Sequence, residues 1–192
     1  MRAYWVIGFA ITAGTIVRAA DCTLTVYVHS SPQSGKILWQ AEAAASEMFR
    51  EIVTVQWRSG VVRADAADNG CGIPIEVQIE TGPEGAKVGE DALAYATLFG
   101  KSGTCIHVFL DRVMRYRTVD MATIVLAHVL VHELTHAIEQ VNRHSAEGVM
   151  KATWRYEDYR IMKSGRRLAF APIDVELIHI GIAKRAQQAV SE

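Results

Sequence analysis

The sequence predicts a single α+β domain with a mixed, twisted sheet of about four to five strands, a buried central helix and a helical C-terminal tail. Three observations predict this fold. Short apolar segments separated by turn residues fill most of the N-terminal half, as strands do. One long, apolar helix pattern follows, and the rest of the chain carries two further helix patterns. At 192 residues the chain is long enough for one well-buried domain and too short for two comfortable ones.

The first twenty residues have the layout of a secretory signal. Arg2 supplies a positive start, and a charge-free apolar run follows up to a cleavage site expected near Ala19 or Ala20. The run is short for a membrane span, which needs about 20 apolar residues. We therefore expect a signal peptide over 1–20, a single domain over 21–192, and a secreted product, periplasmic or extracellular. A retained anchor helix is the alternative.

The net charge of the chain limits the classes of molecule that it is expected to bind. The formal net charge is −1, which favours neither nucleic acid nor an anionic membrane surface. After signal removal we expect a monomer without stable membrane insertion.

The chain has three cysteines, which in an oxidising compartment can form at most one internal disulfide. Cys22 with Cys71 is the expected pair, because both stand at predicted strand starts, and Cys105 is left over; three buried thiols are the alternative. No pair of cysteines has zinc-knuckle spacing.

The N-terminal half alternates strands with one helix. Leu24–His29 alternates as a strand does, and Lys36–Glu51 has one apolar helical side. Further strands are predicted at Ile52–Trp57 and, after a polar loop, at Ile73–Ile79.

Two more strands, Ala92–Phe99 and Thr104–Leu110, are joined by a glycine-rich, hairpin-type connection. The strongest helix pattern then covers about Val119–Val141, with Thr118 or Asp120 as its N-cap. It is apolar on most sides, which indicates a helix in the domain centre.

The C-terminal region is helical. A short polar helix is predicted at Trp154–Lys163, ending before Gly165. Pro172 opens the last helix, with Asp174 and Glu176 in its first turn, where the helix dipole favours acidic groups.

The central helix contains the sequence HELTH, running from His132 to His136. Two histidines four residues apart lie on one helix face, so their imidazoles can meet at one ion. Zinc accepts such ligands at ~2.0–2.1 Å and lowers the pKa of a water molecule toward ~7. Glu133, between the two histidines, is positioned to take a proton from that water. The alternative is a pair of hydrogen-bonded core histidines, but burying two imidazoles and a carboxylate without partners costs several kcal/mol.

A catalytic zinc site needs a third protein ligand and an open fourth position. His128 is excluded, because it lies eight residues from His136, about 12 Å along the helix axis, and we interpret it as a structural group. His144, just beyond the helix, is the predicted third ligand. Glu157 is the rival, although its strongly charged surroundings are typical of a solvated face.

Together with His144 and Gly148-Val149-Met150, the HELTH sequence resembles the metzincin clan of zinc peptidases, which carry HExxH, a downstream histidine and a methionine turn. The segment from His128 to Trp154 also resembles small secreted bacterial zincin-like proteins. The resemblance implies a zincin-like, metzincin-type fold in which His132, His136 and His144 bind Zn²⁺. It further implies that Glu133 is the general base, that Met150 is the methionine-turn residue, and that Ala92–Phe99 is the edge strand along which a peptide substrate pairs.

The chain departs from the metzincin pattern after the second histidine. Six residues on, where metzincins have their third histidine, stands Asn142, and the turn glycine is replaced in a region occupied by Gln140 and Val141. Asn142 tolerates the left-handed conformation that such a turn needs. Tyr156 or Tyr159 has a weak spacing match to a tyrosine that stabilises the oxyanion in some metzincins, and a packed aromatic is the alternative for each.

The sequence therefore predicts a secreted zinc metalloendopeptidase, a hydrolase of peptide or protein substrates that uses zinc-activated water. The alternative is a zinc-stabilised binding or toxin-like module without turnover. A metal-free structural domain is the third hypothesis.

Overall fold

The computed structural model describes residues 23–31, 34–62, 74–80, 89, 91–100, 103–116 and 118–189. The predicted signal peptide and the predicted Cys22–Cys71 pair fall outside these residues. Cys105 falls inside them and is a free thiol.

The described residues form a mixed α/β structure in which each predicted strand and helix is present. In chain order the elements are β1 (Thr23–His29), α1 (Gly35–Phe49), β2 (Thr54–Ser59), β3 (Ile75–Glu80), β4 (Ala94–Gly100), β5 (Gly103–Phe109), α2 (Leu110–Val113), α3 (Val119–Glu139), α4 (Tyr156–Lys163) and α5 (Pro172–Ala189). The short helix α2 was not predicted. It begins at Leu110, which the sequence pattern assigns to the end of the preceding strand.

The five strands form one mixed sheet in the order β2-β1-β3-β5-β4. The pairs β1–β2, β1–β3 and β3–β5 are parallel, whereas β4 runs antiparallel to β5. The register of that last pair is irregular between Thr97 and Gly100. Strand β4 is thus an edge strand with one side unpaired in the sheet.

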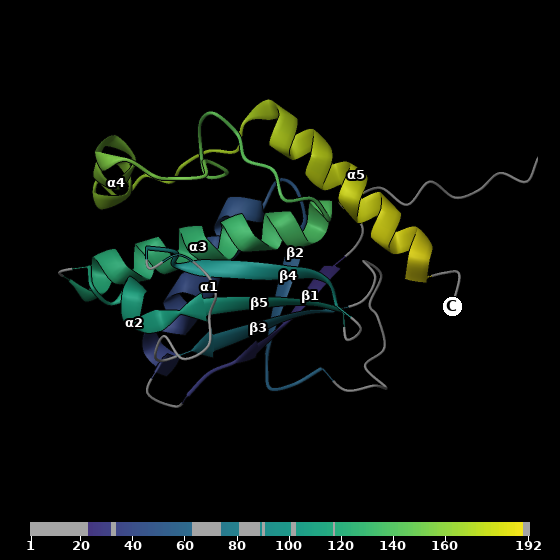
Figure 1. Cartoon of the computed structure of the whole chain (residues 1–192), viewed down its shortest axis with the longest axis horizontal. Coiled ribbons are helices and arrows are strands. Elements are labelled where there is room, and N and C mark those ends of the chain that lie inside the picture. The colour runs from purple at the N-terminus through teal and green to yellow at the C-terminus, as the bar shows by residue number, and fades with distance from the viewer. Residues whose placement is uncertain are drawn as a thin grey trace, which may run out of the picture.

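The sheet carries its helices on one face (Figure 1). Alternate side chains of the central strands are buried against α1 and α3, among them Val26 of β1, Val77 of β3 and Ile106 of β5. Residues of opposite parity, such as Glu76 and His107, are only partly buried. This period of two places the hydrophobic core between the sheet and the two helices.

Helix α3 is the central element of the core. Its N-cap is Thr118, whose hydroxyl accepts a hydrogen bond from the backbone N–H of Met121 at 3.2 Å. From Val125 to Glu139 every residue of the helix is buried. The helix is long and apolar enough to cross a membrane, but 78% of its most apolar window is buried inside the protein, as in the core helix of a globular domain.

Helix α3 ends at a left-handed residue. Gln140 has φ 56° and donates its backbone N–H to the carbonyl of His136 at 2.9 Å. It is the single non-glycine residue with positive φ in the described part of the chain, so Asn142, which could have tolerated the left-handed conformation, does not adopt it. The helix runs through Glu139, and the chain reverses at the next residue.

Helix α5 lies on α3 on the side away from the sheet (Figure 1). The two backbones touch at Gly181, where an added Cβ would stand 2.3 Å from the carbonyl oxygen of Ile138. Only glycine fits such an approach. Asp174, in the first turn of α5, is completely buried.

Candidate metal centre

His132 and His136 lie one turn apart on α3, and both are buried. Each ring is held by a backbone carbonyl. Nδ1 of His132 donates to the carbonyl of Val149 at 2.9 Å, and Nδ1 of His136 donates to that of Val141 at 3.1 Å. Because a carbonyl oxygen can only accept, the hydrogen of each neutral ring is on Nδ1. The Nε2 atoms therefore carry free lone pairs.

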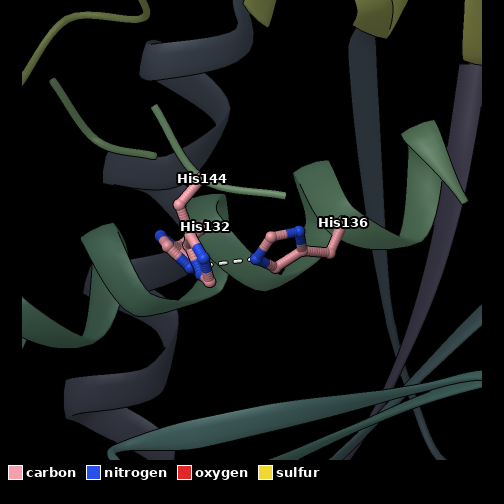
Figure 2. A group of neighbouring side chains, drawn as sticks. All are labelled: His132, His136 and His144. Atoms are coloured by element: carbon pink, nitrogen blue, oxygen red, sulfur yellow. Dashed lines mark hydrogen bonds between the residues drawn. The ribbon is translucent and has the colours of Figure 1, made fainter. Parts of the chain in front are cut away.

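These two Nε2 atoms face each other at 3.1 Å (Figure 2). Burial lowers the pKa of His132 to about 4 and that of His136 to about 4, so both rings are neutral at pH 7. Neither Nε2 then has a hydrogen to donate, and the approach is not a stable hydrogen bond. Two ligands at ~2.0–2.1 Å in a tetrahedron stand roughly 3.3–3.4 Å apart. A cation between the rings would thus satisfy both lone pairs at almost the observed separation.

His144 completes the group from the segment between α3 and α4. One ligand nitrogen from each of His132, His136 and His144 lies within 4.8 Å of the other two. The His144 ring centroid is 5.2 Å from that of His132 and 5.0 Å from that of His136. Unlike the helix pair, His144 is exposed. Three neutral imidazoles are a donor set that suits zinc.

Glu133 is buried beside this group, and burial raises the pKa of its carboxyl to about 7. A carboxyl with a pKa near 7 exchanges protons readily at neutral pH, as a general base must.

A cleft passes over these side chains along β4. One hollow of about 350 Å³ and a second of about 390 Å³ are both lined by Ala94, His132, Glu133 and His144, so they form one continuous cleft. The first extends toward aromatic side chains of the C-terminal region, Trp154 and Tyr159, together with Tyr116 and Leu93. The edge strand, predicted at Ala92–Phe99 and found as β4, thus forms one wall of the cleft.

The other residues considered from the sequence lie apart from the histidine group. His128 donates from Nδ1 to the carbonyl of Ile124 at 2.7 Å, and its Nε2 accepts from the backbone N–H of Leu168 at 3.1 Å. With both nitrogens engaged, His128 has no free lone pair for a metal. Glu157 is exposed on α4 and is not among the residues that meet there.

Of the remaining candidates, Asn142 lines the cleft but is not part of the histidine group. Tyr156 is 73% exposed. Tyr159 lines the cleft, and its hydroxyl lies 2.7 Å from that of Tyr116.

Backbone hydrogen bonds hold the segment that follows His144 in a compact turn. The N–H of Ser145 donates to the carbonyl of Met150 at 2.8 Å, and the N–H of Val149 donates to that of Ala169 at 2.9 Å. Met150 is completely buried. Gly148 has φ 74°, and a Cβ there would stand 2.2 Å from the carbonyl oxygen of Ala169. The turn therefore requires glycine at this position.

The aromatic ring of Trp154 adds a further contact to this segment. Its Nε1–H donates to the carbonyl of Val149 at 3.1 Å, the same oxygen that accepts from His132. One backbone oxygen thus links the cleft wall to a ring of the histidine group.

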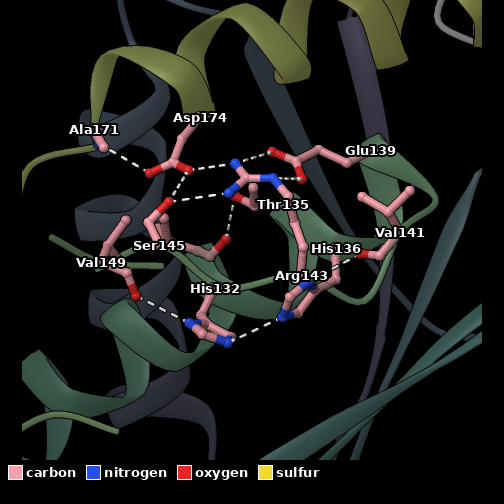
Figure 3. A network of polar contacts seen from close by, with 11 residues as sticks. His132, Thr135, His136, Glu139, Val141, Arg143, Ser145, Val149, Ala171 and Asp174 are labelled. Atoms are coloured by element: carbon pink, nitrogen blue, oxygen red, sulfur yellow. Dashed lines mark hydrogen bonds and ion pairs between the residues drawn. The ribbon is translucent and has the colours of Figure 1, made fainter. Parts of the chain in front are cut away.

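A buried polar network, unforeseen from the sequence, lies behind the group (Figure 3). Asp174 accepts hydrogen bonds from Ser145 and Arg143, and Arg143 also forms an ion pair with Glu139 of α3. The sequence places Asp174 only as a favourable acidic residue in the first turn of a helix. No sequence signal identifies its partners, which are 29 and 31 residues away.

No family model matches this sequence, and no curated protein matches it. Among solved structures, the fold is similar to the crystal structure of archaemetzincin from Methanopyrus kandleri, with a TM-score of 0.49 and 15% sequence identity. The match covers 92% of this chain and 99% of the archaemetzincin chain. At this level of similarity, the function has to be inferred from the geometry of the site.

Proposed function

We propose that the protein is a secreted zinc-dependent endopeptidase in which His132, His136 and His144 hold the metal and Glu133 is the general base. One observation carries the proposal: two buried, neutral imidazoles present their Nε2 lone pairs to each other at 3.1 Å, with a third imidazole beside them. Burying such an arrangement without a cation leaves two acceptors unsatisfied, which costs roughly 1–3 kcal/mol for each.

The backbone carbonyls of Val149 and Val141 are hydrogen-bonded to the rings of the two proposed ligands on α3. By binding Nδ1 they fix the tautomer and the ring orientation, and they make Nε2 a better donor to a metal. A zinc ion held there supplies Lewis acidity, which lowers the pKa of a water molecule at the site toward ~7.

Glu133 is placed to move the proton. Its carboxylate accepts a proton from the attacking water and, as the peptide bond breaks, returns it to the leaving amine. In the metal-free protein burial raises the pKa of this carboxyl to about 7, and a higher pKa makes the carboxylate a stronger proton acceptor.

The edge strand β4 is the proposed binding surface for the substrate main chain. An extended peptide can add to an unpaired strand edge through backbone hydrogen bonds, and the cleft follows β4 past the histidine group. Of the two tyrosines considered for oxyanion stabilisation, Tyr159 is the one that lines the cleft.

Metal analysis and hydrolysis together test the proposal. Protein purified without added metal is expected to contain about one zinc per chain and to cleave casein or a peptide library in a chelator-sensitive manner. Glu133→Gln should keep the zinc and lose roughly 10²–10⁴-fold in cleavage rate. Zinc-dependent folding without cleavage would instead favour the binding module, and protein free of transition metal would refute both.

Export is a separate part of the proposal, and it rests on the N-terminal sequence alone. N-terminal sequencing of the protein recovered from outside the cytoplasm should give a start near residue 21. A retained apolar segment would favour the anchor helix.

A further inference from the structure

The three histidines are oriented by different means. The rings of His132 and His136 are each fixed by a hydrogen bond from Nδ1 to a backbone carbonyl. Within the described part of the chain, the His144 ring makes ring contacts with those two imidazoles and no hydrogen bond. Its place in the group therefore depends on how the backbone on either side of it is held.

Both chain neighbours of His144 bind the same carboxylate oxygen. The hydroxyl of Ser145 donates to Oδ1 of Asp174 at 2.5 Å, and Nη2 of Arg143 donates to the same oxygen at 2.5 Å (Figure 3). Nη1 of Arg143 also donates to the Ser145 hydroxyl at 3.0 Å. The three side chains thus form a closed triangle of hydrogen bonds, and two of them are the chain neighbours of His144.

Asp174 is itself firmly anchored. It is completely buried, and its second oxygen accepts the backbone N–H of Ala171 at 2.9 Å, which caps helix α5. Helix α5 is fixed on α3 by the backbone contact at Gly181. A carboxylate held by these contacts has little freedom to move. It therefore restricts the positions that Arg143 and Ser145 can take.

Arg143 connects the same triangle to the histidine helix. Its Nε lies 3.4 Å from a carboxylate oxygen of Glu139, which stands three residues after His136. The guanidinium therefore bridges two buried carboxylates, one on α3 and one on α5. This bridge connects the helix that contains two of the imidazoles to the segment that contains the third.

We propose that Asp174 is a positioning residue of the metal site, which holds Arg143 and Ser145 so that His144 reaches the metal. The inference rests on the proposed zinc site, but not on turnover. Asp174 acts through His144 and contacts neither the metal nor the substrate.

The test is the dissociation constant for Zn²⁺, measured by titrating chelator-stripped protein in competition with a chromophoric chelator. Asp174→Asn keeps the shape and removes the charge. We expect it to raise the zinc Kd roughly tenfold, the lower end of the range seen when a direct partner of a metal ligand is lost, because Asp174 bonds the neighbours of His144 and not its ring. Circular dichroism establishes that the variant is folded.

Asp158→Asn is the matched control. Asp158 is also a buried first-turn aspartate, which accepts a backbone N–H at its helix N-cap and pairs with a basic side chain, Lys151. It touches neither neighbour of His144. Its replacement should lower the stability of the protein but leave the zinc Kd within roughly threefold, because it supports neither a metal ligand nor a neighbour of one.

Measuring the effect of Asp174→Asn in a His144→Ala variant distinguishes a positioning role of Asp174 from a general electrostatic or structural role. If Asp174 acts through His144, Asp174→Asn should change the zinc Kd there by less than roughly twofold. A full loss of affinity in this background as well would overturn the inference, because the effect would not pass through His144.

Ser145→Ala supplies a milder variant should Asp174→Asn fail to fold. It removes one donor from the triangle and should raise the zinc Kd several-fold, again only when His144 is present. Wild-type protein that binds zinc while both variants bind it equally well would refute the positioning role alone. Wild-type protein that binds no zinc would refute the proposed function.

Discussion

Helix α3 and the segment between α3 and α4 both contribute to the histidine group, and they hold their side chains in contrasting ways. On α3, the helix repeat brings His132 and His136 together, and the two rings are buried and hydrogen-bonded. In the following segment His144 is exposed, and contacts with α5 fix the backbone around it. The helix sets its pair through local geometry, whereas the third imidazole depends on tertiary contacts. We therefore expect His144 to be displaced from the group more easily than His132 or His136.

Removing one imidazole from each region gives the largest effect and tests this contrast most directly. His136→Ala should weaken zinc binding more than roughly 100-fold, above the range for losing an outer partner, because it destroys the preformed pair. His144→Ala leaves that pair intact, so we expect a smaller loss, which is still at least the roughly 10–100-fold typical of losing an outer partner. Competition titration of the two variants measures both. Equal losses would contradict the distinction between helix and loop.

Gly148→Ala tests how tightly the loop region is packed. The new Cβ would stand 2.2 Å from the carbonyl oxygen of Ala169, and φ is 74°. Strain and overpacking together should lower the free energy of unfolding by about 2–4 kcal/mol.

Gly165→Ala is the control for that prediction, because φ there is 76° and no atom lies within 4 Å of the added Cβ. It should cost only about 1 kcal/mol for the left-handed conformation. Similar costs in chemical denaturation would mean that the Gly148 turn is not closely packed.

Glu133→Gln tests the cost of burying a charge on the helix side in metal-free protein. Burial raises the folded-state pKa from 4.5 to about 7. The contribution of Glu133 to stability is therefore fully present below pH 4.5 and is lost as the pH rises through 7. The variant has no such loss, so above pH 7 it should be more stable than wild type by about 2–3 kcal/mol.

Urea denaturation from pH 4.5 to pH 8, with chelator present, measures that difference. It should vanish near pH 4.5. A difference independent of pH would show that the carboxyl is not the titrating group.

Gln140→Gly, at the junction of the two regions, should have the smallest effect. Glycine relieves the left-handed conformation, but it loses the hydrogen bonds from Nε2 of Gln140 to the hydroxyl of Thr104 at 3.2 Å and to the carbonyl of Ala137 at 2.5 Å. We expect the free energy of unfolding to change by less than about 1 kcal/mol. In a Thr104→Val background, where the hydroxyl acceptor is gone but the carbonyl of Ala137 remains, the same change should be more favourable than in the wild type. No difference between the backgrounds would mean that the hydrogen bond to Thr104 contributes nothing.

The sequence predicts best what local geometry decides. The pairing of His132 with His136 follows from the helix repeat, and the cap at Thr118 follows from its hydroxyl next to an apolar helix pattern. Strand and helix positions follow from periodicity, since the core face of each element must be apolar. The order of strands in the sheet depends on crossovers between distant segments, and only the edge position of Ala92–Phe99 was expected, from the resemblance.

The contacts around His144 could not be predicted from the sequence. Sequence reasoning favoured His144 over Glu157 by weighing charge, and the structure brings His144 to the helix pair while Glu157 lies exposed. It allowed the left-handed conformation at Asn142, whereas Gln140 takes that conformation. The bonds to Asp174 join residues 29 and 31 positions apart, and single-residue preferences contain no information about such pairs.

The contact between Gly181 and Ile138 has a mechanical consequence for the molecule. No side-chain layer separates α3 from α5 at that point, so neither helix can slide along the other without the backbones first moving apart. Asp174 lies seven residues before Gly181, about 10 Å along the helix axis. Its distance from the histidine helix is therefore set by a contact between two backbones, and not by side chains that could change rotamer.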